Sequence, residues 1–109
     1  MIKRALSHIV EKQLKKGKSL FVLGPRQVGK TTLAKSLRTD LELNLATTSE
    51  RLKYERSPEI LSQKALAFKK KPLIYIDEVQ KVPALFGEIQ VLADQGKAQF
   101  FLTGSSARK

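Results

Sequence analysis

The stretch Leu20–Leu33 reads LFVLGPRQVGKTTL and is the part of the sequence that decides the fold. Its first four residues, 20–23, are apolar, as expected for a short buried strand. The spacing G-x-x-x-x-G-K-T then runs from Gly24 to Thr31, and apolar residues continue beyond it at helical intervals. A strand, a glycine loop and a helix in this order form the context of a phosphate-binding loop.

The chemistry of a triphosphate explains why the loop has these residues. Gly24 and Gly29 have no Cβ, so the backbone can turn tightly and bring its N–H groups close to phosphate oxygens. The helix that begins near Lys30 directs more N–H groups and its positive dipole end at the same anion. Lys30 can reach the β- and γ-phosphates, and the Thr31 hydroxyl can bind Mg²⁺. The predicted nucleotide-binding residues are Gly24, Pro25, Arg26, Gln27, Val28, Gly29, Lys30, Thr31 and Thr32.

Two features of this loop also allow a plainer interpretation. The pattern could be a glycine turn with Lys30 merely solvated, although a chance match is expected in only roughly a few per thousand chains this long. Arg26 could contact a phosphate, but a solvated loop arginine is the favoured interpretation. The flanking strand and helix favour phosphate binding for the loop as a whole.

Composition points to anionic partners. The 109 residues carry 21 Lys and Arg against 10 Asp and Glu, a formal net charge of +11, which favours nucleotides or nucleic acid. Much of the excess lies in two clusters, Lys15-Lys16-Lys18 and Lys69-Lys70-Lys71, for which solvated lysines are the favoured interpretation. Without cysteine there is no disulfide framework or thiolate metal site. No apolar run approaches the roughly 20 residues that span a bilayer, so we expect a cytoplasmic protein without a membrane partner.

Hydrophobic periodicity predicts alternating helices and strands along the rest of the chain. The pair Thr47 and Glu50 resembles a capping box, and Ser57-Pro58 is a second helix start. His8 has no partner at ligand spacing and is taken as an ordinary helix residue. The alternation predicts an α/β fold in three layers, with helices on both faces of a mostly parallel sheet. The expected helices span about 2–16, 30–38, 47–56, 57–68 and 83–96, and the expected strands span 20–23, 40–45, 73–76 and 99–103.

Two further strands are expected to end in residues suited to nucleotide chemistry, because ligands of an open α/β sheet collect beyond the carboxyl ends of its strands. Four apolar residues precede Asp77-Glu78, which is the Walker B arrangement. In that role Asp77 would hold Mg²⁺, and Glu78 would orient or deprotonate the attacking water. An acidic turn after a strand is the plainer alternative. Ser105, or else Thr103, is the candidate for contacting the γ-phosphate, although Gly-Ser-Ser is also an ordinary turn sequence.

Three segments together resemble a known family. The sequences GPRQVGKTTL at 24–33, IDEVQKVP at 76–83 and LTGSSAR at 102–108 are similar to AAA-type P-loop ATPases of bacteria and archaea that carry an uncharacterised C-terminal domain. The resemblance covers essentially the whole chain. It implies ATP as the nucleotide. It also implies that the strand expected at 99–103 lies between the P-loop strand at 20–23 and the Walker B strand at 73–76. The implied roles are Walker A for Lys30 and Thr31, Walker B for Asp77 and Glu78, and sensor for Ser105 or Thr103.

Members of this family are much longer than the sequence in hand. They continue with a fifth core strand, a helical lid and a further domain, so we expect residues 1–109 to be a partial core, truncated after the fourth strand. Without a fifth strand, the strand at 20–23 would lie at an exposed edge that invites self-association. Arg56 and Arg108 are conceivable arginine fingers supplied in trans, with nothing specific to support either.

Four functions are compatible with these observations. The favoured one is Mg²⁺-dependent ATP hydrolysis with Glu78 activating water. The second is a non-catalytic fragment that binds ATP or ADP. The third is a P-loop kinase, which would need an arginine-rich lid that does not follow here. The fourth is a nucleic-acid-associated module that uses the basic surface.

Overall fold

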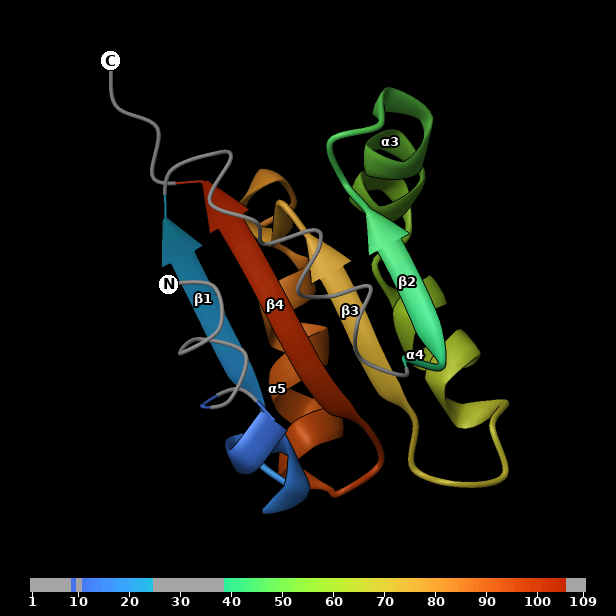
Figure 1. Ribbon diagram of the computed structural model, residues 1–109. Coiled ribbons are helices and arrows are strands. Elements are labelled where there is room, and N and C mark those ends of the chain that lie inside the picture. Colours follow the sequence, from blue (N-terminus) through green and yellow to red (C-terminus); the bar gives the residue numbers. More distant parts are fainter. Residues whose placement is uncertain (1–8, 10, 25–38, 106–109) are drawn as a thin grey trace.

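Strands and helices alternate along the chain in the computed structural model, which describes residues 9, 11–24 and 39–105 (Figure 1). Residues 11–15 are helical, and the helix expected over 30–38 lies outside the described residues. The named elements are β1 (Leu20–Gly24), β2 (Leu41–Asn44), α3 (Thr48–Arg56), α4 (Glu59–Leu66), β3 (Leu73–Asp77), η1 (Val79–Lys81), α5 (Leu85–Asp94) and β4 (Gln99–Ser105).

The four strands form one sheet in the order β1-β4-β3-β2, and every neighbouring pair is parallel. The predicted α/β class with a parallel sheet is therefore confirmed. The strand β4 lies between β1 and β3, which is the order that the family resemblance implied. Because the strands are parallel, their carboxyl ends all lie at one edge of the sheet, at the top of Figure 1. We call this the carboxyl edge, and the opposite one the amino edge.

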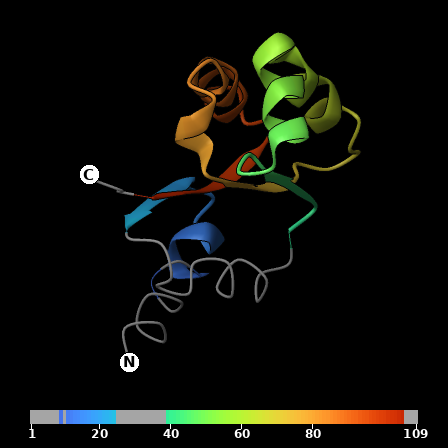
Figure 2. The same ribbon diagram turned by 90° about the horizontal axis from the view of Figure 1, so that it is seen from above.

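Helices lie on both faces of the sheet. In Figure 2, α3, α4 and α5 cover one face, and the helical segment 11–15 lies on the other. Gln99, at the start of β4, ties this segment to the sheet, because its Nε2 donates hydrogen bonds to the carbonyls of Leu14 (2.7 Å) and Lys18 (2.9 Å). The three-layer arrangement expected from the sequence is thus present in the described part of the chain.

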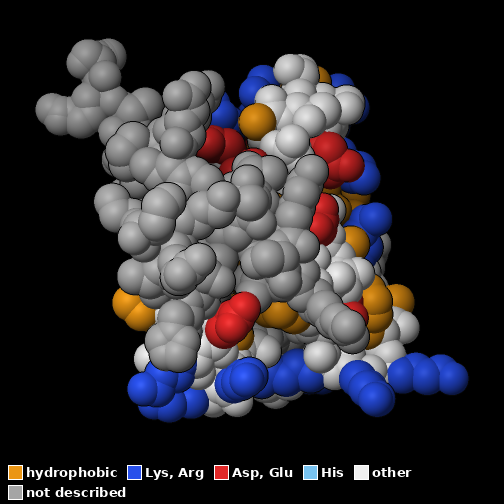
Figure 3. Space-filling view, viewed as in Figure 1, with side chains coloured by type: hydrophobic (Ala, Val, Ile, Leu, Met, Phe, Trp, Pro, Cys, Tyr) orange, Lys and Arg blue, Asp and Glu red, His pale blue; other side chains and the backbone are white. Residues whose placement is uncertain are grey.

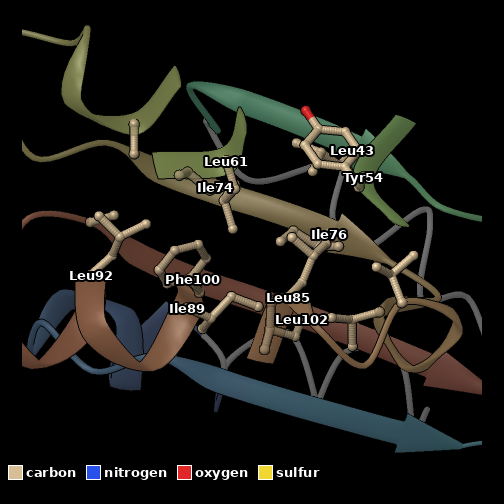
Figure 4. Packing of buried hydrophobic residues seen from close by; sticks show 14 of the residues in the cluster. Leu43, Tyr54, Leu61, Ile74, Ile76, Leu85, Ile89, Leu92, Phe100 and Leu102 are labelled. Carbon is tan, nitrogen blue, oxygen red and sulfur yellow. The ribbon is translucent and has the colours of Figure 1, made fainter. Parts of the chain in front are cut away.

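Two apolar clusters fill the space on either side of the sheet. The smaller one joins Tyr75 and Phe101 to Leu14 and to side chains of β1. The larger one packs the three helices against the sheet, and its side chains point toward one another in Figure 4. The members labelled there are Leu43, Tyr54, Leu61, Ile74, Ile76, Leu85, Ile89, Leu92, Phe100 and Leu102.

The strand β1 is the outer strand on one side of the described sheet. Its Phe21 is 47% exposed, and the ring lies against Phe86 of α5 with the centroids 6.0 Å apart. Within the described part of the chain, this edge therefore presents an exposed apolar side chain and no further strand beside β1, which are the features that favour strand pairing or association.

Most boundaries of helices and strands that we predicted from turn residues agree with the structure to within two residues. Gly17 and Gly96, at the ends of the first and last expected helices, have positive φ values of 82° and 68°, as helix-terminating glycines do. Thr47 is the N-cap of α3, as the capping-box pattern predicted, but its side chain makes no capping hydrogen bond. The structure also differs from the expectations. The N-cap of α4 is Pro58, not Ser57, so this helix begins at Glu59, and it ends at Leu66. The last helix, α5, is confined to Leu85–Asp94, the short helix η1 was not expected, and β4 extends to Ser105.

Tyr54 gives the fold a predicted sensitivity to alkaline pH. Burial of the phenol, with a smaller contribution from the Glu50 carboxylate, raises the pKa of Tyr54 from 10.0 to about 12. The folded state therefore holds the proton more tightly than the unfolded state. The associated stability is fully present below pH 10 and is lost as pH rises toward 12, by up to about 3 kcal/mol.

Urea unfolding at pH 9 and pH 11.5 checks this expectation against the Tyr54→Phe variant. The variant keeps the ring and all the lysines, so it shares every other alkaline titration. We expect wild type to lose more unfolding free energy than the variant between the two pH values. An equal loss in both proteins would contradict the role given to Tyr54.

Candidate nucleotide-binding site

Four of the residues singled out in the sequence meet at the carboxyl edge of β3 and β4. Asp77 ends β3 and is paired with Thr103 of β4, whose Oγ1 donates a 2.9 Å hydrogen bond to Asp77 Oδ1. Ser105 ends β4, and its Oγ donates a 2.5 Å hydrogen bond to Glu78 Oε2. Each hydroxyl therefore holds one carboxylate across the two strands.

Glu78 has an uncommon backbone conformation. Its φ of 58° and ψ of 45° lie in the left-handed region, and no other non-glycine residue in the described ranges has a positive φ. Such a conformation costs roughly 1–2 kcal/mol for a residue with a Cβ. It turns the chain from β3 into η1 at this position, with the side chain 6% exposed and held against Ser105. Strain of this kind is typical of functional sites.

Gln80 is a site residue that the sequence analysis missed. Its Nε2 donates a 2.7 Å hydrogen bond to Glu78 Oε1, so both oxygens of the Glu78 carboxylate accept from protein donors. The Oε1 atom of the same amide is buried and has no hydrogen-bond partner among the residues that the structure describes. A buried polar atom without a partner is uncommon and needs an explanation such as a missing ligand or water. The only signal in the sequence was the glutamine two positions after the acidic pair.

Tyr75 is the second residue that was missed. Its hydroxyl lies 3.2 Å from Thr103 Oγ1, and Thr103 is completely buried. A threonine hydroxyl has one proton, and here Thr103 donates it to Asp77, so Tyr75 must be the donor to Thr103. The resulting chain from Tyr75 through Thr103 fixes the orientation of the Asp77 carboxylate.

The predicted loop begins at the end of β1, and β4 lies between β1 and the strand that leads to these acids. Gly24 is the last residue of β1 and is paired with Ser105 across a parallel ladder, in which neighbouring strands lie about 4.8 Å apart. Of the predicted nucleotide-binding residues only Gly24 lies within the described part of the chain. Residues 25–32, including Lys30 and Thr31, lie outside it.

Asp77 has the donor chemistry that Mg²⁺ requires. Its Oδ1 accepts from Thr103, and its Oδ2 accepts no hydrogen bond from the described residues. Mg²⁺ in nucleotide sites is usually held by one or two carboxylates together with phosphate oxygens. Within residues 9, 11–24 and 39–105, no group of three or more His, Cys, Asp or Glu side chains could hold a metal ion. A single free carboxylate oxygen at this position fits shared coordination with a nucleotide.

The structure places two tethered carboxylates at one strand end of a parallel α/β sheet, with one strand between them and Gly24, the first residue of the predicted loop, as expected for the nucleotide-binding class. A family model described as an AAA domain matches residues 16–109, and the chain belongs to this family. Membership implies nucleotide binding in general. No curated protein matches the sequence. Among the described residues, no helix combines the length and the apolar character that crossing a membrane requires.

Proposed function

We propose that the protein binds ATP with Mg²⁺ at the carboxyl edge of the sheet and hydrolyses it. The observation that carries the proposal is the meeting of Asp77, Glu78 and Ser105 beside Gly24, the first residue of the predicted loop. The residues come from three strands that are adjacent in space but distant in the sequence. Phosphoryl transfer requires mainly positioning and charge stabilisation, which such a convergence can supply.

In this proposal the loop amides and Lys30 hold the β- and γ-phosphates, while Thr31 and Asp77 would hold Mg²⁺. The metal supplies charge neutralisation on the phosphates when it is bound. Glu78 orients a water molecule toward the γ-phosphorus and accepts its proton as the bond to ADP breaks. Glu78 Oε1 accepts a hydrogen bond from Gln80 and Oε2 accepts one from Ser105, and these bonds hold the carboxylate at the carboxyl edge where the water is proposed to lie.

A second candidate is nucleotide binding without turnover. The hydrogen bonds from Ser105 and Gln80 engage both oxygens of Glu78 and tie the carboxylate in place, which suits a structural role for Glu78. Phosphate release separates the two candidates, because ATP would bind in both but would be converted to ADP and phosphate only in the first.

Calorimetric titration with ATP and Mg²⁺, comparing wild type with Lys30→Ala, tests the proposal. Hydrogen bonds to charged groups contribute about 1.5–3 kcal/mol, so we expect the affinity to fall by about 10- to 150-fold. Lys97→Ala is the matched control, because Lys97 is exposed and lies just before β4 at the amino edge. Equal affinities of all three proteins, or no binding to wild type, would overturn the proposed site.

A further inference from the structure

The strand order brings the lysine clusters together at the amino edge. Lys15, Lys16 and Lys18 precede β1, Lys97 precedes β4, and Lys69–Lys71 precede β3. Because β1, β4 and β3 are successive neighbours in a parallel sheet, the three segments that carry these lysines lie side by side. Figure 3 shows Lys and Arg side chains in a row along the lower margin of the molecule. We call these seven lysines the lysine edge.

The lysine edge is exposed and carries a net positive charge. All seven lysines are exposed, and the two ion pairs found among the described residues both lie on α3. Nearby acidic residues in the same helix ends and turns are Glu11, Asp40 and Asp94, so seven cations face three carboxylates. Asp40 is already engaged, since its Oδ2 accepts a 2.8 Å hydrogen bond from the Leu73 N–H. Unpaired lysines held next to one another repel, and an extended polyanion would relieve that repulsion.

We propose that the lysine edge binds the phosphate backbone of double-stranded DNA. Three separate segments present the charges across the sheet rather than around a pocket, which suits a linear polyanion. Flexible ammonium groups contact phosphates without reading bases, so the binding is independent of sequence.

A duplex fits this edge better than a single strand. Proteins that bind single strands stack successive bases on several aromatic rings. Among the exposed aromatic side chains of the described residues, only Phe68 belongs to the segments of the lysine edge. Phe21 and Phe86 lie against each other at β1 and α5 instead. The surface therefore offers charge without a stacking platform.

DNA bound here would leave the carboxyl edge accessible, because the two edges lie at opposite ends of the strands (Figure 1). The inference is independent of the proposed ATPase function and survives if that function fails. It also explains the two basic clusters in the sequence, to which the nucleotide site gives no role.

Fluorescence anisotropy with a labelled 20-base-pair duplex of random sequence tests the proposal between 50 and 200 mM salt. The test variant is Lys69→Gln/Lys70→Gln/Lys71→Gln, and the matched control is Lys53→Gln/Arg56→Gln/Lys81→Gln on α3 and η1. Both variants remove three positive charges from exposed side chains. The competitors are polyglutamate and a single-stranded oligonucleotide of the same length, and circular dichroism checks the fold of each variant.

We expect wild-type affinity to fall steeply with salt, with the test variant binding at least about tenfold more weakly than wild type. Its log–log salt dependence should be shallower by about 2–3, since each lost phosphate contact lowers the slope by about one. The affinity of the control for the duplex should stay within about threefold of the wild-type affinity at each salt concentration. A change of that size is smaller than the effect that a single phosphate contact has on affinity between 50 and 200 mM salt. Absent binding, equal losses in the two variants, or tighter binding of polyglutamate or single-stranded DNA would each overturn the proposal.

Discussion

Replacing Glu78 with glutamine is expected to lower the rate of ATP hydrolysis by about 10²–10⁴-fold, the usual contribution of a general base. The amide is close to the carboxylate in size but cannot accept a proton from water. Affinity for ATP should change little, because Glu78 is proposed to contact the water rather than the nucleotide. Phosphate release at saturating ATP, together with calorimetric titration, measures the two effects separately.

Glu88→Gln is the matched control for that substitution. Glu88 lies on α5 and its carboxylate also accepts a hydrogen bond from a serine, Ser62, but it faces α4 rather than the carboxyl edge. Ser105→Ala provides a second comparison, since it removes one hydrogen bond to Glu78 and keeps the carboxylate. We expect the control to retain wild-type turnover and Ser105→Ala to lose less than Glu78→Gln. Equal turnover in wild type and Glu78→Gln would remove Glu78 from the mechanism.

Phe100→Ala is expected to cost the largest amount of stability, about 3–5 kcal/mol. Phe100 is completely buried at the centre of the larger cluster, on a strand with neighbours on both sides. Removing the ring leaves a cavity among the helices and the sheet that the surrounding side chains fill only in part. Because small domains have about 5–15 kcal/mol of stability in total, a large part of it would be lost.

Urea unfolding at neutral pH measures this loss, with Phe68→Ala as the control. Phe68 is 38% exposed and lies outside the two apolar clusters, so its truncation should cost less than about 1 kcal/mol. Similar midpoints for the two variants would show that the cluster under α5 does not hold the fold together as described.

The fold was largely predictable because its signals are local. Short apolar runs at 20–23 and 73–76 mark strands, and Gly17 and Gly96 mark helix ends, so strand boundaries were placed within two residues. The first run was expected to be a buried strand, but it lies at the edge of the described sheet with Phe21 exposed. The order of the strands in the sheet was not predictable from these local signals. Periodicity does not say which strands pair, and only the family resemblance indicated that β4 separates β1 from β3. The convergence of the lysine clusters depends on that order and could not be read from the residues alone.

The candidate site was predictable in its residues and less so in its geometry. Thr103 and Ser105 were considered alternatives for a single role, whereas the structure gives each one its own carboxylate. Gln80 donates a hydrogen bond to Glu78, and the backbone of Glu78 itself has a left-handed conformation. No residue type in that segment predicts this conformation. Tyr75 alternates like any core residue of β3. Its contact with Thr103, which pairs with Asp77 in the ladder, follows only from β3 and β4 being neighbours.

A crystal structure with Mg²⁺ and a non-hydrolysable ATP analogue tests the central claim most directly. We predict that the terminal phosphate lies at the carboxyl edge, within hydrogen-bonding reach of Lys30 and facing Asp77 and Glu78. Gly24 and Ser105 would then flank it at the ends of β1 and β4. A nucleotide bound at the amino edge, or one whose phosphates lie away from the two acids, would contradict the account.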